Sequence, residues 1–86
     1  MTHRATARFW RCYHNLPAEV RERADRAFAL LRDNPQHPSL HLKRVGSFLS
    51  VRVDIAHRAL AVPDGDDLTW VWVGSHDDYD RLIRRH

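Results

Sequence analysis

The chain has 86 residues, a net charge of +3 and one cysteine. This length accommodates one domain with a small core, and a single cysteine excludes an internal disulfide. No apolar run approaches the roughly 20 residues that span a bilayer, so we expect one cytoplasmic domain over residues 1–86, with neither a signal peptide nor a transmembrane helix.

The charges are sorted along the chain. Residues 1–33 hold seven arginines against four acids, residues 35–62 hold four cations against Asp54 alone, and residues 64–80 hold six aspartates and no cation. Lys and Arg that neutralise phosphates supply most of the sequence-independent affinity for nucleic acids. The middle segment, whose cations fall on predicted strands, is therefore the expected binding surface for a polyanion.

Apolar residues at helical spacing predict two helices in the first third of the chain. The first, of about ten residues, begins after Thr6, a typical N-cap residue; its apolar residues are Phe9, Trp10, Tyr13 and Leu16. The second begins at Pro17 and ends at Asn34, because the residue before a proline avoids helical backbone. Its apolar stripe consists of Val20, Ala24, Ala27, Phe28 and Leu31, with Leu30 at the margin. Two helices joined this tightly form an antiparallel hairpin.

From residue 40 onward the apolar period changes to two, which predicts strands. The predicted strands are residues 40–45, 48–55, 58–62 and 68–73, with turns at Gly46 and at residues 63–67. Short connections favour antiparallel pairing between neighbours. Residues 79–85 predict a short helical tail, and residues 1–5 an arm or a weak edge strand.

These elements predict an α+β domain: an N-terminal helical hairpin packed on one face of an antiparallel sheet of about four strands. In residues 48–55, the apolar side chains Leu49, Val51, Val53 and Ile55 should face the helices. We expect Leu49, Val51 and Val53 to meet a helical face made of Val20, Ala24, Phe28 and Leu31, with Phe28 buried.

Residues 68–73 are large and apolar throughout, which is typical of a strand covered on both faces. We expect Gly74 to break this strand and to bring His76 and Tyr79 to the rim of the sheet. Two interpretations remain open: these two residues form a site, or His76 caps a turn while the Tyr79 ring packs on the sheet.

The seven histidines do not predict a metal site. His37 and His41 are four residues apart, but Pro38 denies them a common helical face, and no cysteine lies nearby. Ser75 adjoins His76 without a nucleophile elbow, and the chain has no glycine-rich phosphate loop. We therefore expect neither a metal nor another cofactor.

What remains is a cationic and imidazole set on or just beyond the predicted sheet, namely Lys43, Arg52, Arg58, His76 and Tyr79. Cleavage of RNA by its own 2′-hydroxyl needs cations that hold the phosphate and stabilise the developing charge, and a group that transfers a proton. An imidazole ordinarily titrates near neutral pH, so His76 is the candidate for the proton. A sheet face that only binds is the open alternative.

The order of elements resembles the RelE/ParE superfamily of bacterial toxins from toxin–antitoxin pairs. The resemblance runs from about Phe9 to Leu82. The segments that carry it are Phe9-Trp10, Leu16-Pro17, residues 34–40 (NPQHPSL), 50–53 (SVRV), 57–60 (HRAL) and 70–76 (WVWVGSH), with Tyr79. It implies a toxin fold and a cognate antitoxin.

In the RNA-cleaving members of that superfamily, basic residues on the sheet and an Arg or His with an aromatic residue near the C-terminal end act on messenger RNA in the ribosomal A site. The resemblance therefore implies an endoribonuclease whose partners are the ribosome and messenger RNA. Its implied catalytic residues are Arg52, Arg58, His76 and Tyr79, with RNA binding by Lys43 and Arg44. The ParE branch instead inhibits DNA gyrase, and this alternative stays open.

Two features depart from the superfamily's pattern. Residues 1–5 lack the apolar alternation of its N-terminal strand, and three carboxylates that repel phosphate, those of Asp54, Asp77 and Asp78, lie close in sequence to the basic set. A non-catalytic protein that keeps the fold is thus a third interpretation. Small size and positive charge predict an acidic, largely helical antitoxin segment across the Arg-bearing helices or along a sheet edge.

Overall fold

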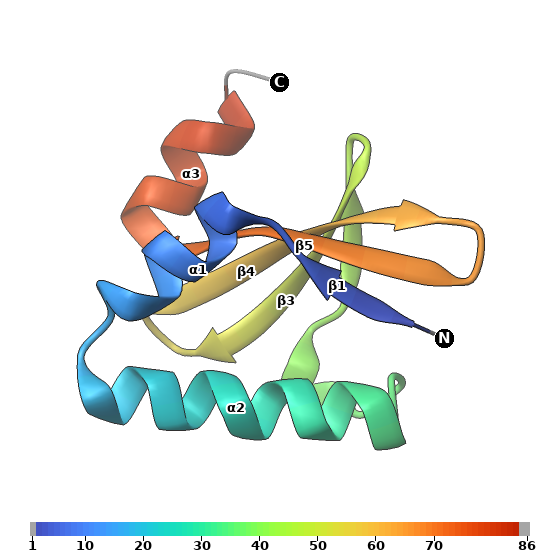
Figure 1. Cartoon of the computed structure of the whole chain (residues 1–86), viewed down its shortest axis with the longest axis horizontal. Coiled ribbons are helices and arrows are strands. Elements are labelled where there is room, and N and C mark those ends of the chain that lie inside the picture. The colour runs from blue at the N-terminus through green and yellow to red at the C-terminus, as the bar shows by residue number, and fades with distance from the viewer. Residues whose placement is uncertain (1, 85–86) are drawn as a thin grey trace.

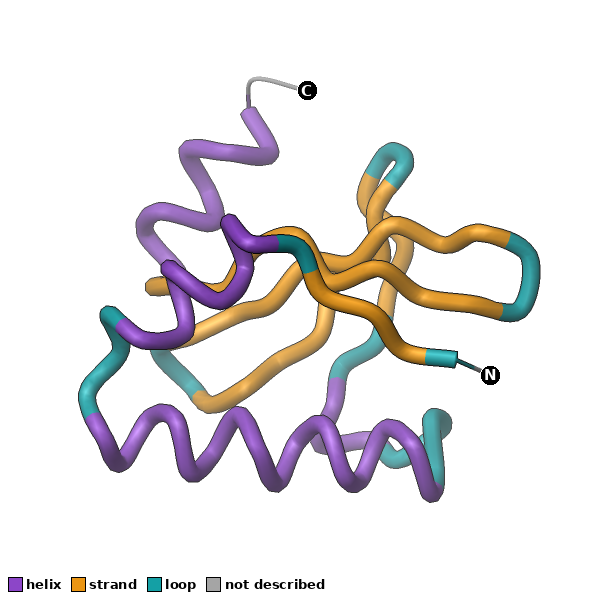
Figure 2. Tube along the Cα trace, in the orientation of Figure 1, coloured by secondary structure: helices purple, strands orange, loops and turns teal. Residues whose placement is uncertain are grey.

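Residues 2–84 are described by the computed structural model, and they form a sheet with helices on both of its faces (Figures 1 and 2). The described elements are β1 (His3–Ala5), α1 (Ala7–His14), α2 (Ala18–Asp33), the 3-10 helix η1 (Pro38–Leu40), β2 (Lys43–Val45), β3 (Phe48–Asp54), β4 (His57–Asp64), β5 (Asp67–Ser75) and α3 (His76–Arg84).

The five strands lie in the order β1-β5-β4-β3-β2. The meander from β2 to β5 is antiparallel, and β1 pairs in parallel with β5. The predicted α+β fold, with an N-terminal helical hairpin on an antiparallel sheet, is confirmed. The sheet has one strand more than expected, and that strand is β1.

Backbone hydrogen bonds explain how β1 forms without apolar alternation. The Leu68 N–H donates to the carbonyl of Thr2 at 2.9 Å, and the Thr6 N–H donates to the carbonyl of Trp70 at 3.0 Å. These bonds satisfy backbone groups along an edge of β5 that would otherwise be unpaired. Three residues are enough, because the pairing depends on the backbone and not on side chains.

The two N-terminal helices begin and end close to the predicted residues. Thr6 caps α1, since its Oγ1 accepts a hydrogen bond from the Phe9 N–H at 3.1 Å. Pro17 precedes α2, so the helix begins one residue later than predicted. In α2, Val20 and Leu31 are buried and hold the helix on the sheet.

Apolar side chains cover both faces of the sheet. The larger cluster joins α1 and α2 to the sheet through Leu16, Val20, Leu31, Leu40, Val51, Ala59, Ala61, Leu68, Trp70 and Val73. The smaller cluster lies under α3 and consists of Leu60, Trp72 and Tyr79, with Leu82 and Ile83 packed against it. Burial on both faces confirms that residues 68–73 form an interior strand.

The predicted burial of Phe28 is wrong, and Ile55, which we expected to face the helices with the other apolar side chains of β3, is at the surface. Phe28 is 37% exposed; its ring meets His3 and Trp70, at 4.8 and 6.4 Å between ring centroids, and these two rings cover only part of it. Ile55 is 80% exposed, because β3 ends at Asp54 and Ile55 falls in the turn that follows.

The predicted strand at residues 40–45 is shortened to three residues. His37 caps η1, since its Nδ1 accepts a hydrogen bond from the Ser39 N–H at 3.2 Å, and Pro38 is favourable at the helix start. His41 then takes a left-handed conformation with φ 45°. Leu40 still enters the core, at 1% exposure, but from the 3-10 helix.

Gly74 was predicted to break the last strand, but it lies within that strand. β5 continues to Ser75, and α3 begins at His76, three residues before the predicted tail. A Cβ on Gly74 would lie 2.5 Å from Cζ2 of the Trp72 indole, so the position needs glycine for space. The last predicted residue of the tail, residue 85, lies outside the described residues. No helix in residues 2–84 is long and apolar enough to span a membrane.

Candidate functional site

Strand pairing places two predicted arginines side by side. Arg52 of β3 lies opposite Arg58 of β4, and Arg58 lies opposite Gly74 of β5. Directly opposed residues share a face of the sheet, and like charges in such pairs repel. A β-bulge follows between Arg52 and Asp54, at the end of the strand. The face with this row of residues can therefore attract an anion.

Each of the two arginines is held by one nitrogen. Arg58 Nη1 donates to the carbonyls of Asp54 and His57, at 2.7 and 2.9 Å. Arg52 Nη1 lies 3.2 Å from Nε2 of His41, the residue with left-handed backbone. A guanidinium carries five N–H donors, so in both cases donors remain for a ligand while the side chain keeps its position.

His76 is fixed where β5 turns into α3. Its backbone N–H donates to the carbonyl of Ala56 at 2.7 Å, which ties this junction to the β3–β4 turn. Its ring Nδ1 lies 3.2 Å from Oδ2 of Asp80, one helical turn further on. His76 keeps 43% of its side chain exposed, so the ring is both oriented and accessible.

Tyr79 is buried beneath His76. Its exposure is 3%, and it packs with Leu60 and Trp72. The ring centroids of His76 and Tyr79 are 5.9 Å apart. Because it is buried, Tyr79 cannot stack on an RNA base. Its ring packs on the sheet, as the alternative interpretation described. The remaining role for Tyr79 at the site is to support the His76 ring.

The structure adds His57, which the sequence reasoning missed. Its Nδ1 lies 2.9 Å from Oδ1 of Asp54, and strand pairing places it opposite Ser75, the residue before His76. The sequence feature that could have identified His57 is its position beside Arg58, directly after a turn. Both histidines thus hold a carboxylate on Nδ1, an arrangement that sets the ring's orientation.

Asp54 is neutralised by its neighbours. Burial alone would raise its pKa, but hydrogen bonds from His57, the Ala56 N–H and Arg23, together with the charge of His57, lower the pKa below its usual value. Arg23 of α2 reaches Oδ2 of Asp54 at 3.3 Å. We expected the Asp54 carboxylate to repel phosphate. Its negative charge is instead paired with His57 and Arg23, and the carboxylate orients the His57 ring.

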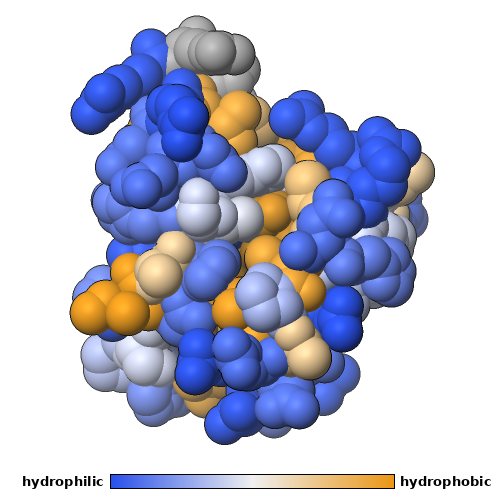
Figure 3. All heavy atoms as spheres, turned by 90° about the vertical axis from the view of Figure 1, so that its left-hand side faces the viewer, coloured by the Kyte–Doolittle hydropathy of each residue, from blue (hydrophilic) through white to orange (hydrophobic). Residues whose placement is uncertain are grey.

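His57, Arg58 and His76 line one cleft of about 450 Å³ between the β3–β4 turn and the start of α3, together with Ile55, Ala56, Ser75 and Asp77. Figure 3 views the side of the molecule that contains this turn and α3, and its surface is mostly hydrophilic with small, separate hydrophobic patches. The cleft is therefore a polar site.

The remaining predicted cations do not line this cleft. Arg52 lines a second cleft, of about 470 Å³, with Arg23 and Arg26 of α2. Lys43 and Arg44 are exposed on β2, at the far edge of the sheet from β1. The structure brings Arg58 and His76 together, sets Arg52 beside them, and leaves the β2 pair apart.

Carboxylates also occur at this end of the sheet. Asp77 and Asp78 lie in the first turn of α3, where negative charge is favourable. Asp78 binds Arg81 at 3.0 Å, and its N–H donates to Ser75 Oγ at 3.1 Å. Within residues 2–84, no group of three or more His, Cys, Asp or Glu side chains is arranged to hold a metal ion.

Comparison with known families and structures identifies the fold. The model of the ParE-like toxin domain matches residues 18–81. No curated protein matches the chain.

Several solved structures are similar at low sequence identity. A chain of the RelB–RelE antitoxin–toxin complex from Methanococcus jannaschii has a TM-score of 0.73 and 12% identity, with 92% of this chain and 96% of that chain covered. YafQ from Escherichia coli gives 0.72 and 11%, with 90% and 94% covered. The YoeB/ParE toxin from Agrobacterium tumefaciens gives 0.67 and 16%, with 88% and 99% covered. At these identities the likeness concerns the fold.

Proposed function

The chain belongs to the ParE-like toxin domain family, and we propose that it is the toxin of a toxin–antitoxin pair, an endoribonuclease that cleaves messenger RNA on the ribosome without a metal ion. The observation that carries this proposal is the cleft in which two oriented histidines, His57 and His76, lie beside the Arg58 guanidinium. Two proton-transfer groups and a cation are the components that RNA cleavage by its own 2′-hydroxyl requires.

The reaction uses these groups as follows. One imidazole takes the proton of the 2′-hydroxyl as its oxygen attacks phosphorus, and the other gives a proton to the departing 5′-oxygen. The products are a 2′,3′-cyclic phosphate and a 5′-hydroxyl. Arg58, with Arg52 opposite it on β3, binds the phosphate and stabilises the charge that develops on its oxygens.

A dependence on the ribosome is consistent with the small number of cations at the cleft. Affinity for free RNA grows with the number of phosphates that Lys and Arg neutralise. Arg58 lines the cleft and Arg52 lies opposite it on β3, while Lys43 and Arg44 are on β2, at the edge of the sheet and two strands from β4. These few contacts give little affinity for free RNA. On the ribosome, the messenger RNA is already held in position, so the toxin needs less affinity of its own.

An antitoxin is the expected protein partner. Similar solved structures include RelB–RelE and DinJ–YafQ toxin–antitoxin complexes. The positive net charge favours an acidic antitoxin.

A second candidate is inhibition of DNA gyrase, and the match to a ParE-like family model favours it. A gyrase inhibitor would act through a binding surface and would not need His57 or His76. A toxin domain that only binds its target, without catalysis, is a variant of this candidate.

The deciding experiment is controlled expression in a bacterial host, followed by mapping of RNA ends on translated messages and an assay for broken DNA. We expect new 5′-hydroxyl ends and intact DNA. Arg58→Ala and His76→Ala should each lower cleavage by about 10² or more, as when a transition-state cation or a proton-transfer group is removed. Removal of zinc and other transition metals from the purified toxin, with the Mg²⁺ that ribosomes need retained, should not change cleavage.

Two control variants remove the same residue types elsewhere. Arg11→Ala removes an exposed arginine of α1, and His37→Asn removes a histidine while keeping a favourable helix cap. Both should cleave like the wild type. Intact messages with broken DNA would establish the gyrase alternative instead, and intact messages with intact DNA and normal growth would reject both.

A further inference from the structure

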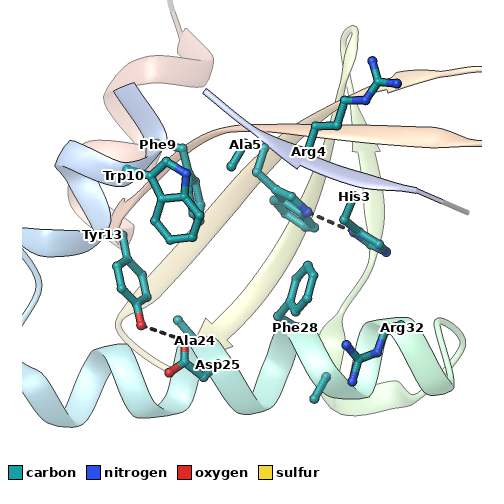
Figure 4. Close-up of a pocket in the computed structure, with 12 residues that line it drawn as sticks. His3, Arg4, Ala5, Phe9, Trp10, Tyr13, Ala24, Asp25, Phe28 and Arg32 are labelled. Carbon is teal, nitrogen blue, oxygen red and sulfur yellow. Dashed lines mark hydrogen bonds between the residues drawn. The ribbon is translucent and has the colours of Figure 1, made fainter. Parts of the chain in front are cut away.

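A second concave surface lies apart from the cleft, between α1, α2 and β1 (Figure 4). This groove has a volume of about 440 Å³ and shares no lining residue with the cleft. Its walls are mainly aromatic, formed by Phe9, Trp10, Tyr13, Phe28 and Trp70. Trp10 and Phe28 remain 48% and 37% exposed. Exposed aromatic surface of this kind, with polar groups at its margin, is typical of a binding site for another protein.

The two ends of the groove differ in charge. At one end the Tyr13 hydroxyl donates to Oδ1 of Asp25 at 2.8 Å, so this acid is occupied. At the other end lie His3 of β1 and Arg32 of α2 (Figure 4). A ligand that spans the groove therefore contacts aromatic rings along its length and the hydrogen-bond donors of His3 and Arg32 at one end.

The hydrogen bonds of His3 determine where its proton lies. Trp70 Nε1–H donates to His3 Nδ1 at 3.1 Å (Figure 4). An imidazole nitrogen that accepts a hydrogen bond carries no proton, so the neutral ring has its N–H at Nε2. Nε2 is covered and has no hydrogen-bond partner within residues 2–84. A covered donor without an acceptor is unfavourable, and an incoming acceptor would relieve that cost.

Arg32 adds a cation that is free to move. Its guanidinium lies 5.9 Å from the centre of the Phe28 ring, and its side chain is 61% exposed. The contact with Asp33 is long, at 3.8 Å, and exposed. Burial first, and then positive charges that include Arg32, lower the pKa of His3, so the ring stays neutral and keeps its single donor.

We propose that this groove binds a segment of a partner protein that inserts a large apolar side chain between Trp10 and Phe28 and places a carboxylate on His3 Nε2–H and Arg32. Since Nε2 is covered in the free protein, binding requires a lining side chain to move aside, and Arg32, which is 61% exposed, is the lining cation that can do so. Identification of the segment as part of the antitoxin rests on the function proposed above.

Charge selects this occupant over a second copy of the chain. The chain carries a net charge of +3, and one end of the groove carries Arg32 and the N–H donor of His3. Two copies repel each other, whereas an acidic segment is attracted and satisfies both donors.

The test uses the purified full-length protein and two synthetic helical peptides. One carries leucines and glutamates on the same face, and the other has glutamines in place of the glutamates. We expect the glutamate peptide to bind at least about tenfold more tightly, because hydrogen bonds to a carboxylate are stronger than those to an amide. In NMR spectra the Trp70 indole N–H and the His3 Nε2–H should shift on binding.

Matched variants assign the preference to the groove. Arg32→Ala should reduce the preference for glutamate several-fold, while Arg44→Ala, which removes an exposed arginine of β2, should retain it. His3→Ala should also reduce the preference, because Arg32 alone then holds the carboxylate. Because Arg32 is exposed, its variant tests the proposal even where the His3 variant does not fold.

Equal binding of the two peptides, shifts that map outside the groove, or no binding at about 1 mM peptide would each overturn the proposal. Self-association of the free protein through the groove would assign it to a second copy instead. Arg58→Ala should bind both peptides like the wild type. The two proposals therefore fail separately: loss of RNA cleavage leaves peptide binding standing, and the reverse also holds.

Discussion

At the level of single residues, like charges are held close together beside the cleft. Arg52 and Arg58 face each other across two strands, a pairing that costs free energy unless another group offsets it. Asp54 is the neighbouring anion, but Arg23 and His57 already occupy it. An anion that enters from solvent therefore gains the unsatisfied attraction of both arginines.

Asp54 should make the stability of the protein depend on pH in the acidic range. Its pKa is lowered in the folded state, so below the ordinary pKa of an aspartate, about 4, the unfolded chain binds more protons than the folded chain. The stabilisation from Asp54 is complete above that value and is lost as the pH falls through the lowered pKa. We expect the difference in unfolding free energy between wild type and Asp54→Asn to shrink as the pH falls below about 4.

Chemical denaturation of both proteins across this pH range measures that difference. The control is Asp64→Asn, which changes an exposed aspartate in the β4–β5 hairpin. Parallel pH profiles for the two variants would show that the contacts of Asp54 do not contribute to stability.

At the level of elements, the continuity of β5 into α3 places the site. Gly74 and Ser75 extend the strand, and His76 starts the helix without an intervening loop. The His76 N–H then binds the Ala56 carbonyl of the β3–β4 turn. The position of His76 is therefore set by two backbone segments and not by a flexible tail.

Gly74→Ala should destabilise the fold by about 1–3 kcal/mol, because the added methyl group overpacks the Trp72 side chain and forces a shift. The added Cβ would lie 2.5 Å from the Trp72 indole, which is only 8% exposed. Urea denaturation of Gly74→Ala, Trp72→Leu and the double variant measures this clash. We expect the two changes to be non-additive, with a lower cost of Gly74→Ala once the smaller side chain has replaced the indole.

A control for backbone conformation comes from the β4–β5 hairpin. Gly65 has φ +59° and no atom within 4 Å of an added Cβ. Gly65→Asn should change stability little, because asparagine tolerates left-handed backbone. An equal cost of Gly74→Ala with and without the indole would mean that the position needs glycine for another reason.

At the level of the whole molecule, a small domain presents two separate binding surfaces. The cleft lies where the β3–β4 turn meets α3, and the groove lies between α1, α2 and β1. Phe28 lines the groove with a ring that is 37% exposed, while Leu31, one turn further along α2, is 1% exposed. The same helix therefore supplies core residues and binding residues.

This division predicts different costs for two substitutions in α2. Leu31→Ala should lower the free energy of unfolding by about 2–5 kcal/mol, as expected for a buried leucine. Phe28→Ala should cost less than the roughly 3–5 kcal/mol of a buried phenylalanine, because its ring is partly exposed in the folded state. It should also weaken binding of the glutamate peptide. Denaturation and peptide titration measure both effects, and a larger stability loss for Phe28→Ala than for Leu31→Ala would contradict this division.

The sequence by itself determined the elements and the fold class, because local chemistry decides them. The caps and prolines around α1 and α2 locate those helices to within a residue or two, and the alternation in β3 and the apolar run in β5 identify the central strands. The same patterns carried the resemblance that the ParE-like family match confirms. Arg58 and His76 were selected for their side-chain chemistry, which the sequence states directly.

Only the tertiary structure decided which residues are neighbours and which are covered. It paired β1 with the open edge of β5 through backbone bonds that no side-chain pattern encodes. It placed His57 and His76 in one cleft, packed Tyr79 of α3 against the sheet and left Phe28 in the groove. These outcomes depend on contacts between segments far apart in sequence, whereas sequence patterns describe one segment at a time.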